Sequence, residues 1–156
     1  MQDLETRVLA LEAKVAELQD RSALQALRFR YHIAVNEKSL DSLHLLFTED
    51  AEVDFEGIGS ARGHTEIERL YAELVGGSPF IKQFIHNHMI SLDGDSATGS
   101  SYLDARTVRD GESILVAARF DDEYVRSEGE WRFKALRLHV FFAVPLQEGW
   151  AASVAP

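Results

Sequence analysis

Hydrophobic residues near the N-terminus recur every three or four positions, which is the spacing of an amphipathic helix. In "LETRVLALEAKVAELQDR" they follow a heptad, with Val8 and Val15 at position a and, at position d, Leu4, Leu11 and Leu18. Branched residues at a and leucine at d favour two parallel strands, in which Arg7 at g faces Glu12 at e of the other chain. The run is under three heptads, so the alternative is an amphipathic helix lying on its own domain or on a partner. Both interpretations favour a homo-oligomer, a dimer or a trimer.

Further along, the pattern predicts short helices and then long strands. We expect a second helix from a Ser22 cap to about Asn36, and a short third helix from Ser39 or Asp41 to Phe47. "AEVDFEG" is typical of a short strand, and "HTEIERLYAEL" has helical spacing, with Tyr71 on its apolar side. Four long alternating runs follow, divided by the turn signals "DGD", "RDG" and "SEG": about 80–92, 96–108, 112–126 and 130–144.

Helices first and strands later indicate an α+β fold rather than alternating βαβ units. A long, bent antiparallel meander with helices on its concave face would leave a conical cavity, which is a natural ligand site. We divide the chain into an N-terminal helix (1–21), a single domain (22–147) and a tail (148–156).

Composition narrows the class of protein. The 156 residues are 46% hydrophobic, which is enough for a core, and the net charge of −10 argues against nucleic-acid binding. The chain has no cysteine, so disulfides, zinc thiolates and a thiol nucleophile are excluded. No apolar run approaches the roughly 20 residues of a membrane span, and the charged N-terminus is unlike a signal peptide. We therefore expect a cytoplasmic protein that does not bind membranes.

The predicted second helix carries a polar stripe between two apolar sides. At about 100° per residue the stripe contains Gln25, Arg28, His32 and Asn36. This arrangement fits a helix that overlooks a polar chamber. The alternative is a second solvated edge, or a helix packed by apolar partners on two sides.

Alternation in "FIKQFIHNHMISL" places Gln83 and Asn87 on one face of a strand and His86 and His88 on the other. Two histidines at this spacing resemble metal ligands, but no third ligand accompanies them. We predict surface or interface histidines, and no metal.

The last strand places Arg137 and His139 on one face. Burying the arginine charge without a partner would cost several kcal/mol, so this face meets solvent or lines a polar cavity. An unperturbed imidazole titrates near neutrality, which makes His139 the best candidate base. The alternative is a hydrogen-bonded or interface histidine.

Several short strings, in this order, resemble one family: "ALQALRFRYHIAVN", "LFTEDAEVDFEGIGSARG", "NHMISLDGDSATGSSYL", "SILVAARFDDEYVRSEGEWRFKAL" and "PLQEGW". They resemble the SnoaL-like branch of the nuclear transport factor 2-like superfamily, which includes scytalone dehydratase, bile-acid dehydratase and hexachlorocyclohexane dehydrochlorinase. The resemblance implies a cone-shaped, cystatin-like α+β barrel, oligomers, a pocket for a small hydrophobic molecule and no cofactor.

The resemblance also implies an Asp–His dyad that removes a proton. The aspartate position matches Asn36 and the histidine position matches Gln83, and both are amides here. The surviving candidates are His139 as a base that has moved and Tyr31 as a proton donor. Six substrate-binding residues accompany them: Asn36, Gln83, Arg137, His32, Asn87 and Phe55. We expect ligand binding with cofactor-free elimination, isomerisation or cyclisation; the alternatives are non-catalytic ligand binding and an oligomeric scaffold.

Overall fold

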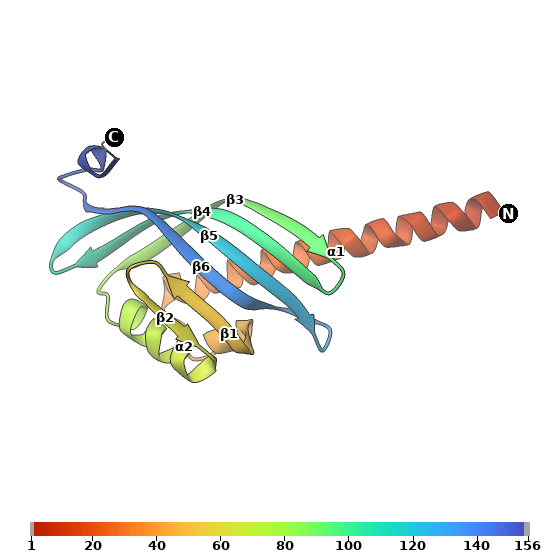
Figure 1. Ribbon diagram of the computed structural model, residues 1–156, viewed down its shortest axis with the longest axis horizontal. Coiled ribbons are helices and arrows are strands. Elements are labelled where there is room, and N and C mark those ends of the chain that lie inside the picture. The colour runs from red at the N-terminus through yellow and green to blue at the C-terminus, as the bar shows by residue number, and fades with distance from the viewer. Residues whose placement is uncertain (1, 155–156) are drawn as a thin grey trace.

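The computed structural model describes residues 2–154, which form a curved sheet crossed by one long helix (Figure 1). The helix, α1, spans Gln2–Glu37 and extends well beyond the sheet at its N-terminal end. No helix in the described part of the chain is long and apolar enough to cross a membrane. The remaining elements are η1 (Leu43–Leu46), β1 (Phe47–Phe55), β2 (Gly59–Arg62), α2 (His64–Tyr71), η2 (Ala72–Gly76), β3 (Ile81–Asp93), β4 (Ser96–Arg109), β5 (Glu112–Ser127), β6 (Glu130–Pro145) and η3 (Ala151–Val154).

The six strands form a single mixed sheet in the order β2-β1-β6-β5-β4-β3. Strands β3 to β6 are the expected antiparallel meander, and β1 joins it parallel to β6. α1 and α2 cover one side of the curved sheet, which remains open rather than closing into a barrel (Figure 1). The predicted α+β class is confirmed, and each long strand begins and ends within one residue of its expected bounds.

Two local predictions are wrong, and one short strand was not predicted. The two N-terminal helices are one continuous helix because neither glycine nor proline interrupts the chain at Ser22, so the boundary proposed at residue 21 lies inside α1. The predicted third helix is a short 3-10 turn, and Phe47 begins β1 instead of ending a helix. The segment "GSAR" is a strand, β2, which pairs with β1 after a turn at Gly57, whose φ is +70°.

A bulge in β3 changes which side chains face the helices. The pairing with β4 shifts between His86 and Met89, and Asn87 has φ of +53°, a conformation that asparagine adopts more readily than most residues. The alternation therefore inverts at this point. His88 turns inward, while Asn87 is exposed, contrary to the face that simple alternation predicts.

The core lies between the concave face and the two helices. α1 contributes Leu24, Leu27, Tyr31 and Val35, each no more than 1% exposed, and α2 contributes Ile67 and Tyr71. Aromatic side chains of the sheet meet them, with the rings of Tyr31 and Phe120 6.0 Å apart. Tyr31 is thus held among other rings and has little freedom to move.

A buried ion pair connects α1 to the middle of the sheet. Arg28 of α1 contacts Asp122 of β5, and both side chains are 0% exposed. The guanidinium also lies over the rings of Phe120, at 4.4 Å, and Phe133, at 4.8 Å. Burial is the largest single influence on the pKa of Arg28 and lowers it, but the charge of Asp122, its contact with Arg28 and the nearby tyrosines Tyr124 and Tyr31 together outweigh burial, and the net direction is upward. The arginine therefore remains charged inside the core.

Replacing Arg28 with methionine should destabilise the protein strongly, because Asp122 would remain as a buried carboxylate without its partner. We expect the free energy of unfolding, measured by urea denaturation, to fall by about 3–5 kcal/mol. The double variant Arg28→Met/Asp122→Leu should recover part of this loss, since no lone charge remains. Arg30→Met, two residues further along α1 at an exposed position on the opposite side of the helix, is the matched control. Equal stability of Arg28→Met and the control would contradict the account.

Candidate functional site

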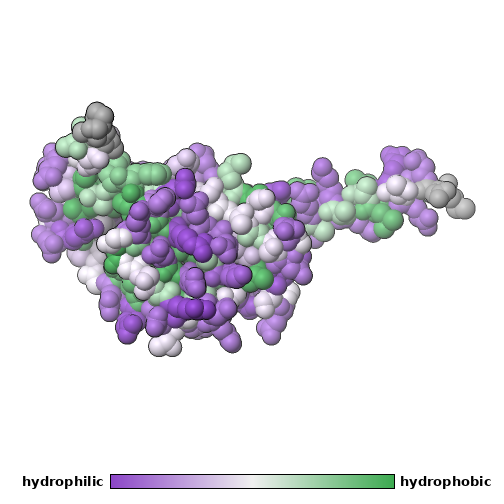
Figure 2. All heavy atoms as spheres, viewed as in Figure 1, coloured by the Kyte–Doolittle hydropathy of each residue, from purple (hydrophilic) through white to green (hydrophobic). Residues whose placement is uncertain are grey.

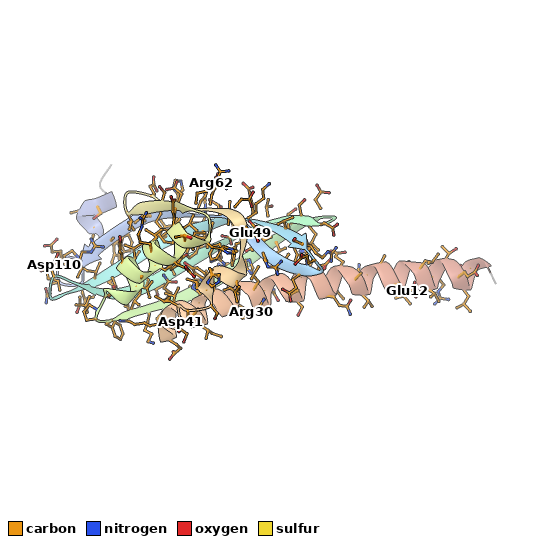
Figure 3. The ribbon with its side chains drawn as sticks, turned by 90° about the horizontal axis from the view of Figure 1, so that it is seen from below. Glu12, Arg30, Asp41, Glu49, Arg62 and Asp110 are labelled. Atoms are coloured by element: carbon orange, nitrogen blue, oxygen red, sulfur yellow. The ribbon has the colours of Figure 1, made fainter. Side chains whose placement is uncertain are left out.

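A cavity of about 390 Å³ opens between α2, the C-terminal part of α1 and the sheet. This volume is within the usual range for sites that bind small molecules. Its apolar wall includes Phe55, Phe120 and Leu138, and its polar side chains include Tyr31, Tyr71 and Gln83. The rim includes Asp110, in the turn between β4 and β5 at the end of the molecule opposite the N-terminus (Figure 3).

Two tyrosines from different helices form a hydroxyl pair in this cavity. Tyr71 of α2 donates a hydrogen bond to Tyr31 of α1, with the oxygens 2.8 Å apart. Burial raises the pKa of Tyr31 to about 12, although the Tyr71 hydrogen bond and the charge of Arg28 oppose the shift. Burial also raises the pKa of Tyr71 well above its usual value. Both hydroxyls are therefore protonated near neutral pH, and the hydrogen of Tyr31 is left for another acceptor.

His32 and Gln83 form a second polar pair beside the cavity. The Nδ1 atom of His32 lies 2.9 Å from Oε1 of Gln83, so Nδ1 carries the hydrogen and the amide oxygen accepts it. Burial, with the positive charge of Arg28, lowers the pKa of His32 to about 3. The imidazole is neutral at physiological pH, and its buried Nε2 atom has no hydrogen-bond partner among the described residues.

Asn36 is occupied by the main chain of β3. Its Nδ2 atom donates to the carbonyl oxygen of Gln83 at 2.9 Å, and its Oδ1 atom accepts from the amide nitrogen of Gln83 at 2.7 Å. The side-chain amide thus pairs with the free edge of β3 as a neighbouring strand would. Asn36 holds the strand that carries Gln83, and it is not among the residues that line the cavity.

A chain of buried polar groups continues from the ion pair toward β3. Tyr124 donates its hydroxyl hydrogen to Asp122 at 2.7 Å and lies 3.1 Å from Nε2 of His88. Since that hydrogen is used on Asp122, Nε2 of His88 must be the donor to Tyr124. Burial, with the charge of Arg28, lowers the pKa of His88, which keeps this imidazole neutral as well.

The structure brings together only part of the predicted site. Tyr31, Phe55 and Gln83 line the cavity, and His32 and Asn36 contact Gln83 from the side. The prediction that Arg137 and His139 face the same cavity is wrong. Leu136 and Leu138 take the inward positions on β6, so their neighbours point outward.

On the outer face, Arg137 donates to Glu123 at 2.8 Å, and Nδ1 of His139 lies 2.7 Å from a carboxylate oxygen of Glu56. His139 is 56% exposed, so it is in no position to act as a base on a molecule in the cavity. The predicted role of Asn87 in binding is also corrected, because the bulge in β3 exposes this side chain.

The two histidines considered as metal ligands lie on opposite faces of β3. His86 is exposed and His88 points inward, as a consequence of the bulge. Across residues 2–154, no group of three or more histidine, aspartate or glutamate side chains is arranged to hold a metal ion.

Sequence reasoning missed two parts of the site. Tyr71 has the spacing of a core position on α2, and only the fold places its hydroxyl against Tyr31. Asp122 stands among other acidic residues in "DDEY", so nothing in its surroundings marks it as the partner of Arg28. The signal that could have identified Asp122 is the alternation along β5, which puts it on the same face as Phe120 and Tyr124. A carboxylate between two aromatic residues on one face of a strand is a candidate for a buried, paired charge.

The depressed pKa of His32 predicts loss of stability in acid. Its pKa is about 3 in the folded chain and near 6.5 when unfolded, so between these pH values only the unfolded chain binds the proton. The free energy of unfolding should therefore fall as the pH decreases through this window, by up to about 1.4 kcal/mol per pH unit from this residue. The stabilising difference is fully present above pH 6.5 and is lost toward pH 3.

Urea denaturation at several pH values tests this. His32→Gln should reduce the slope of stability against pH below 6.5, whereas the exposed His86→Gln should leave it unchanged. An identical slope for wild type and His32→Gln would be inconsistent with a buried neutral imidazole.

Comparison with known proteins places the chain in a family. Residues 16–137 match the model of the SnoaL-like domain, which is more than half of the chain. The chain is 30% identical over 135 residues to gamma-hexachlorocyclohexane dehydrochlorinase of Sphingobium indicum, covering 83% of this chain and 85% of that one.

Solved structures agree with the sequence match. A crystal structure of a type 2 hexachlorocyclohexane dehydrochlorinase superposes with a TM-score of 0.80 and 26% identity, covering 85% of this chain and 93% of the other. A protein with a cystatin-like fold from Nostoc punctiforme superposes with a TM-score of 0.69 at 19% identity, covering 78% and 91%, and supports the fold alone. The expected cystatin-like architecture is thus confirmed, and the chain belongs to the SnoaL-like domain family.

Proposed function

We propose that the protein binds a small, largely apolar organic molecule that carries one oxygen acceptor, such as a carbonyl group, in the cavity beneath α2. The observation that carries this proposal is the Tyr31–Tyr71 hydroxyl pair, which lies in a mainly apolar cavity of about 390 Å³. An apolar cavity with a few directed polar groups is typical of small-molecule sites. The aromatic and aliphatic wall supplies affinity, and the polar groups set the orientation of the ligand.

Tyr31 is the main donor to the ligand. Tyr71 donates to Tyr31, which leaves the hydrogen of Tyr31 for the ligand oxygen. A hydroxyl that itself accepts a hydrogen bond is the better donor, because hydrogen bonds in a chain polarise one another. With a pKa of about 12, Tyr31 retains its proton near neutrality and acts as a neutral donor. This donor suits a carbonyl oxygen, or an oxygen that gains negative charge during a reaction.

Gln83 is the second donor. Its Oε1 atom is occupied by His32, so its NH2 group is the part available to the cavity. Asn36 contributes indirectly, by holding the main chain of Gln83 in place. The two amides thus orient one another and the ligand.

Two amides cannot replace an Asp–His base. From the resemblance we expect the aspartate of that dyad to correspond to Asn36 and the histidine to Gln83, and neither amide can remove a proton. With His139 on the outer face, the cavity lining includes no imidazole. This supports ligand binding, with polarisation of the ligand's oxygen, as the function.

A second candidate is cofactor-free proton abstraction that leads to elimination or isomerisation. Two observations favour it. Relatives of this chain are named as dehydrochlorinases, and His32, which lies beside the cavity against Gln83 and outside its lining, has a buried Nε2 without a hydrogen-bond partner while Gln83 holds its Nδ1. The base would then stand on α1 rather than on β3. Its pKa of about 3 makes it a weak base, so deprotonation would depend on Tyr31 stabilising the enolate oxygen.

Binding of 2-acetylnaphthalene and of 2-ethylnaphthalene tests the hydroxyl pair, because the two probes differ mainly in the carbonyl oxygen. We expect the ketone to bind wild type about tenfold more tightly than the hydrocarbon, which is roughly the worth of one good hydrogen bond. Tyr31→Phe should remove this preference and leave hydrocarbon affinity nearly unchanged. Tyr102→Phe, on the exposed outer face, is the control. A ketone preference that survives in Tyr31→Phe would refute the assignment, measured by fluorescence titration.

Exchange of the ketone's methyl hydrogens in heavy water, followed by proton NMR, separates the two candidates. Proton abstraction predicts faster exchange with wild type than with buffer, and loss of the acceleration in both His32→Gln and Tyr31→Phe. Binding alone predicts a tight complex whose exchange rate equals that of free ketone. Acceleration that persists in His32→Gln would exclude His32 as the base.

A further inference from the structure

The N-terminal half of α1 projects from the domain and carries an uncovered apolar stripe. The first contact of α1 with the sheet that involves a side-chain hydrogen bond is at Asp20, which accepts from Trp131 at 3.0 Å and from Arg126 at 2.5 Å. Before it, the helix runs free of the domain, with apolar side chains along its length (Figures 1 and 2). Five heptad residues are exposed by 44–65%: Leu4, Val8, Leu11, Val15 and Leu18.

The stripe continues along the part of α1 that lies on the domain. Phe29 and Ile33 are 49% and 60% exposed. Each follows a residue of the heptad, Leu11 or Val15, by 18 positions, which is about five full helical turns. The two members of each pair therefore lie on one line, and the two lines are about 40° apart on the same side of the helix. Between them the small residues Ser22 and Ala26 occupy this side, so nothing bulky interrupts it.

This side of α1 faces away from its own domain. The residues that α1 buries in the core are centred on Tyr31, with Leu24, Leu27 and Val35 around it. On a helical projection their direction differs from that of the exposed stripe by about 160°. A second helix can thus lie along the stripe while both domains remain on the outside.

We propose that the stripe binds α1 of a second copy of this chain in a parallel two-stranded coiled coil. Charge supports the second copy and its direction. In the parallel arrangement Arg7 of one chain lies beside Glu12 of the other. An antiparallel pair would place the basic g positions, Arg7 and Lys14, against each other and the acidic e positions, Glu5 and Glu12, against each other, which is repulsive.

Pairing also explains how so long a projection remains helical. An isolated helix of about 18 residues is marginal in water, and its stability in proteins comes mainly from packing of its apolar side. No part of residues 20–154 covers the stripe, as the exposure of its side chains shows. The helix is already nucleated by the domain, so a seam of fewer than three heptads can suffice where two free peptides would not associate.

Sedimentation of the full-length chain tests the interface with a matched pair of variants. Leu11 and Leu9 are each 65% exposed, but only Leu11 lies on the stripe. We expect a wild-type particle of about 35 kDa, twice the 17.5 kDa chain. Leu11→Glu should raise the dissociation constant of the dimer at least about a hundredfold, since it buries a pair of like charges. Leu9→Glu should leave the mass unchanged. A monomeric wild type, or an assembly that Leu11→Glu does not weaken, overturns the proposal.

Cross-linking tests whether the two helices are parallel. Because the chain contains no cysteine, any disulfide must form between the introduced residues. In a parallel pair Leu18 faces its own counterpart, so Leu18→Cys should form an intermolecular disulfide under mild oxidation. Leu9→Cys, off the stripe, should remain reduced. In an antiparallel pair, a positions face d positions of the other chain, so Leu18 would instead face a residue such as Val8. Cross-linking only in a mixture of Val8→Cys and Leu18→Cys chains, with none from Leu18→Cys alone, overturns the parallel arrangement.

Discussion

The buried ion pair between Arg28 and Asp122 determines how α1 lies on the sheet. Two fully buried opposite charges tolerate little displacement, because separation leaves each without a partner in a medium of low polarity. The pair therefore sets both the rotation and the axial position of the helix. Tyr31 and His32 follow on the next turn, so one hydroxyl reaches the cavity and one imidazole reaches Gln83. The same positive charge contributes to the low pKa of both His32 and His88.

Much of the fold could be predicted because long strands show alternation and their turns have a recognisable chemistry. The turns at "DGD", "RDG" and "SEG" each contain a glycine at positive φ, which is why they separate the strands so clearly. The parallel addition of β1 to β6 has no such signal, since it depends on contacts between distant segments. β2, at four residues, is too short for its pattern to stand out from a turn.

The site was less predictable, for two physical reasons. Alternation divides a strand into two faces but does not say which face is concave, so Arg137 and His139 could be grouped correctly and still be placed on the wrong side. A bulge inverts the alternation without a mark in the sequence, which is how His88 came to occupy the inward position expected for Asn87. On α1 the helical period correctly grouped Arg28, His32 and Asn36 on the side that faces β3 and β5. Gln25, the first residue of the predicted stripe, is exposed.

The way Asn36 pairs with β3 also has a consequence for solubility. β3 is a 13-residue edge strand of the sheet. An edge strand of this length with free main-chain groups can pair with a strand of another protein. Asn36 occupies the carbonyl and amide of Gln83, and Arg21 donates to the carbonyl of Ile90 at 2.7 Å. The bulge at Asn87 distorts β3 between Gln83 and Ile90. The edge strand on the other side of the sheet is β2, which has only four residues. Neither edge of the sheet therefore offers a long, straight strand to which strands of other chains could add, which limits edge-to-edge aggregation.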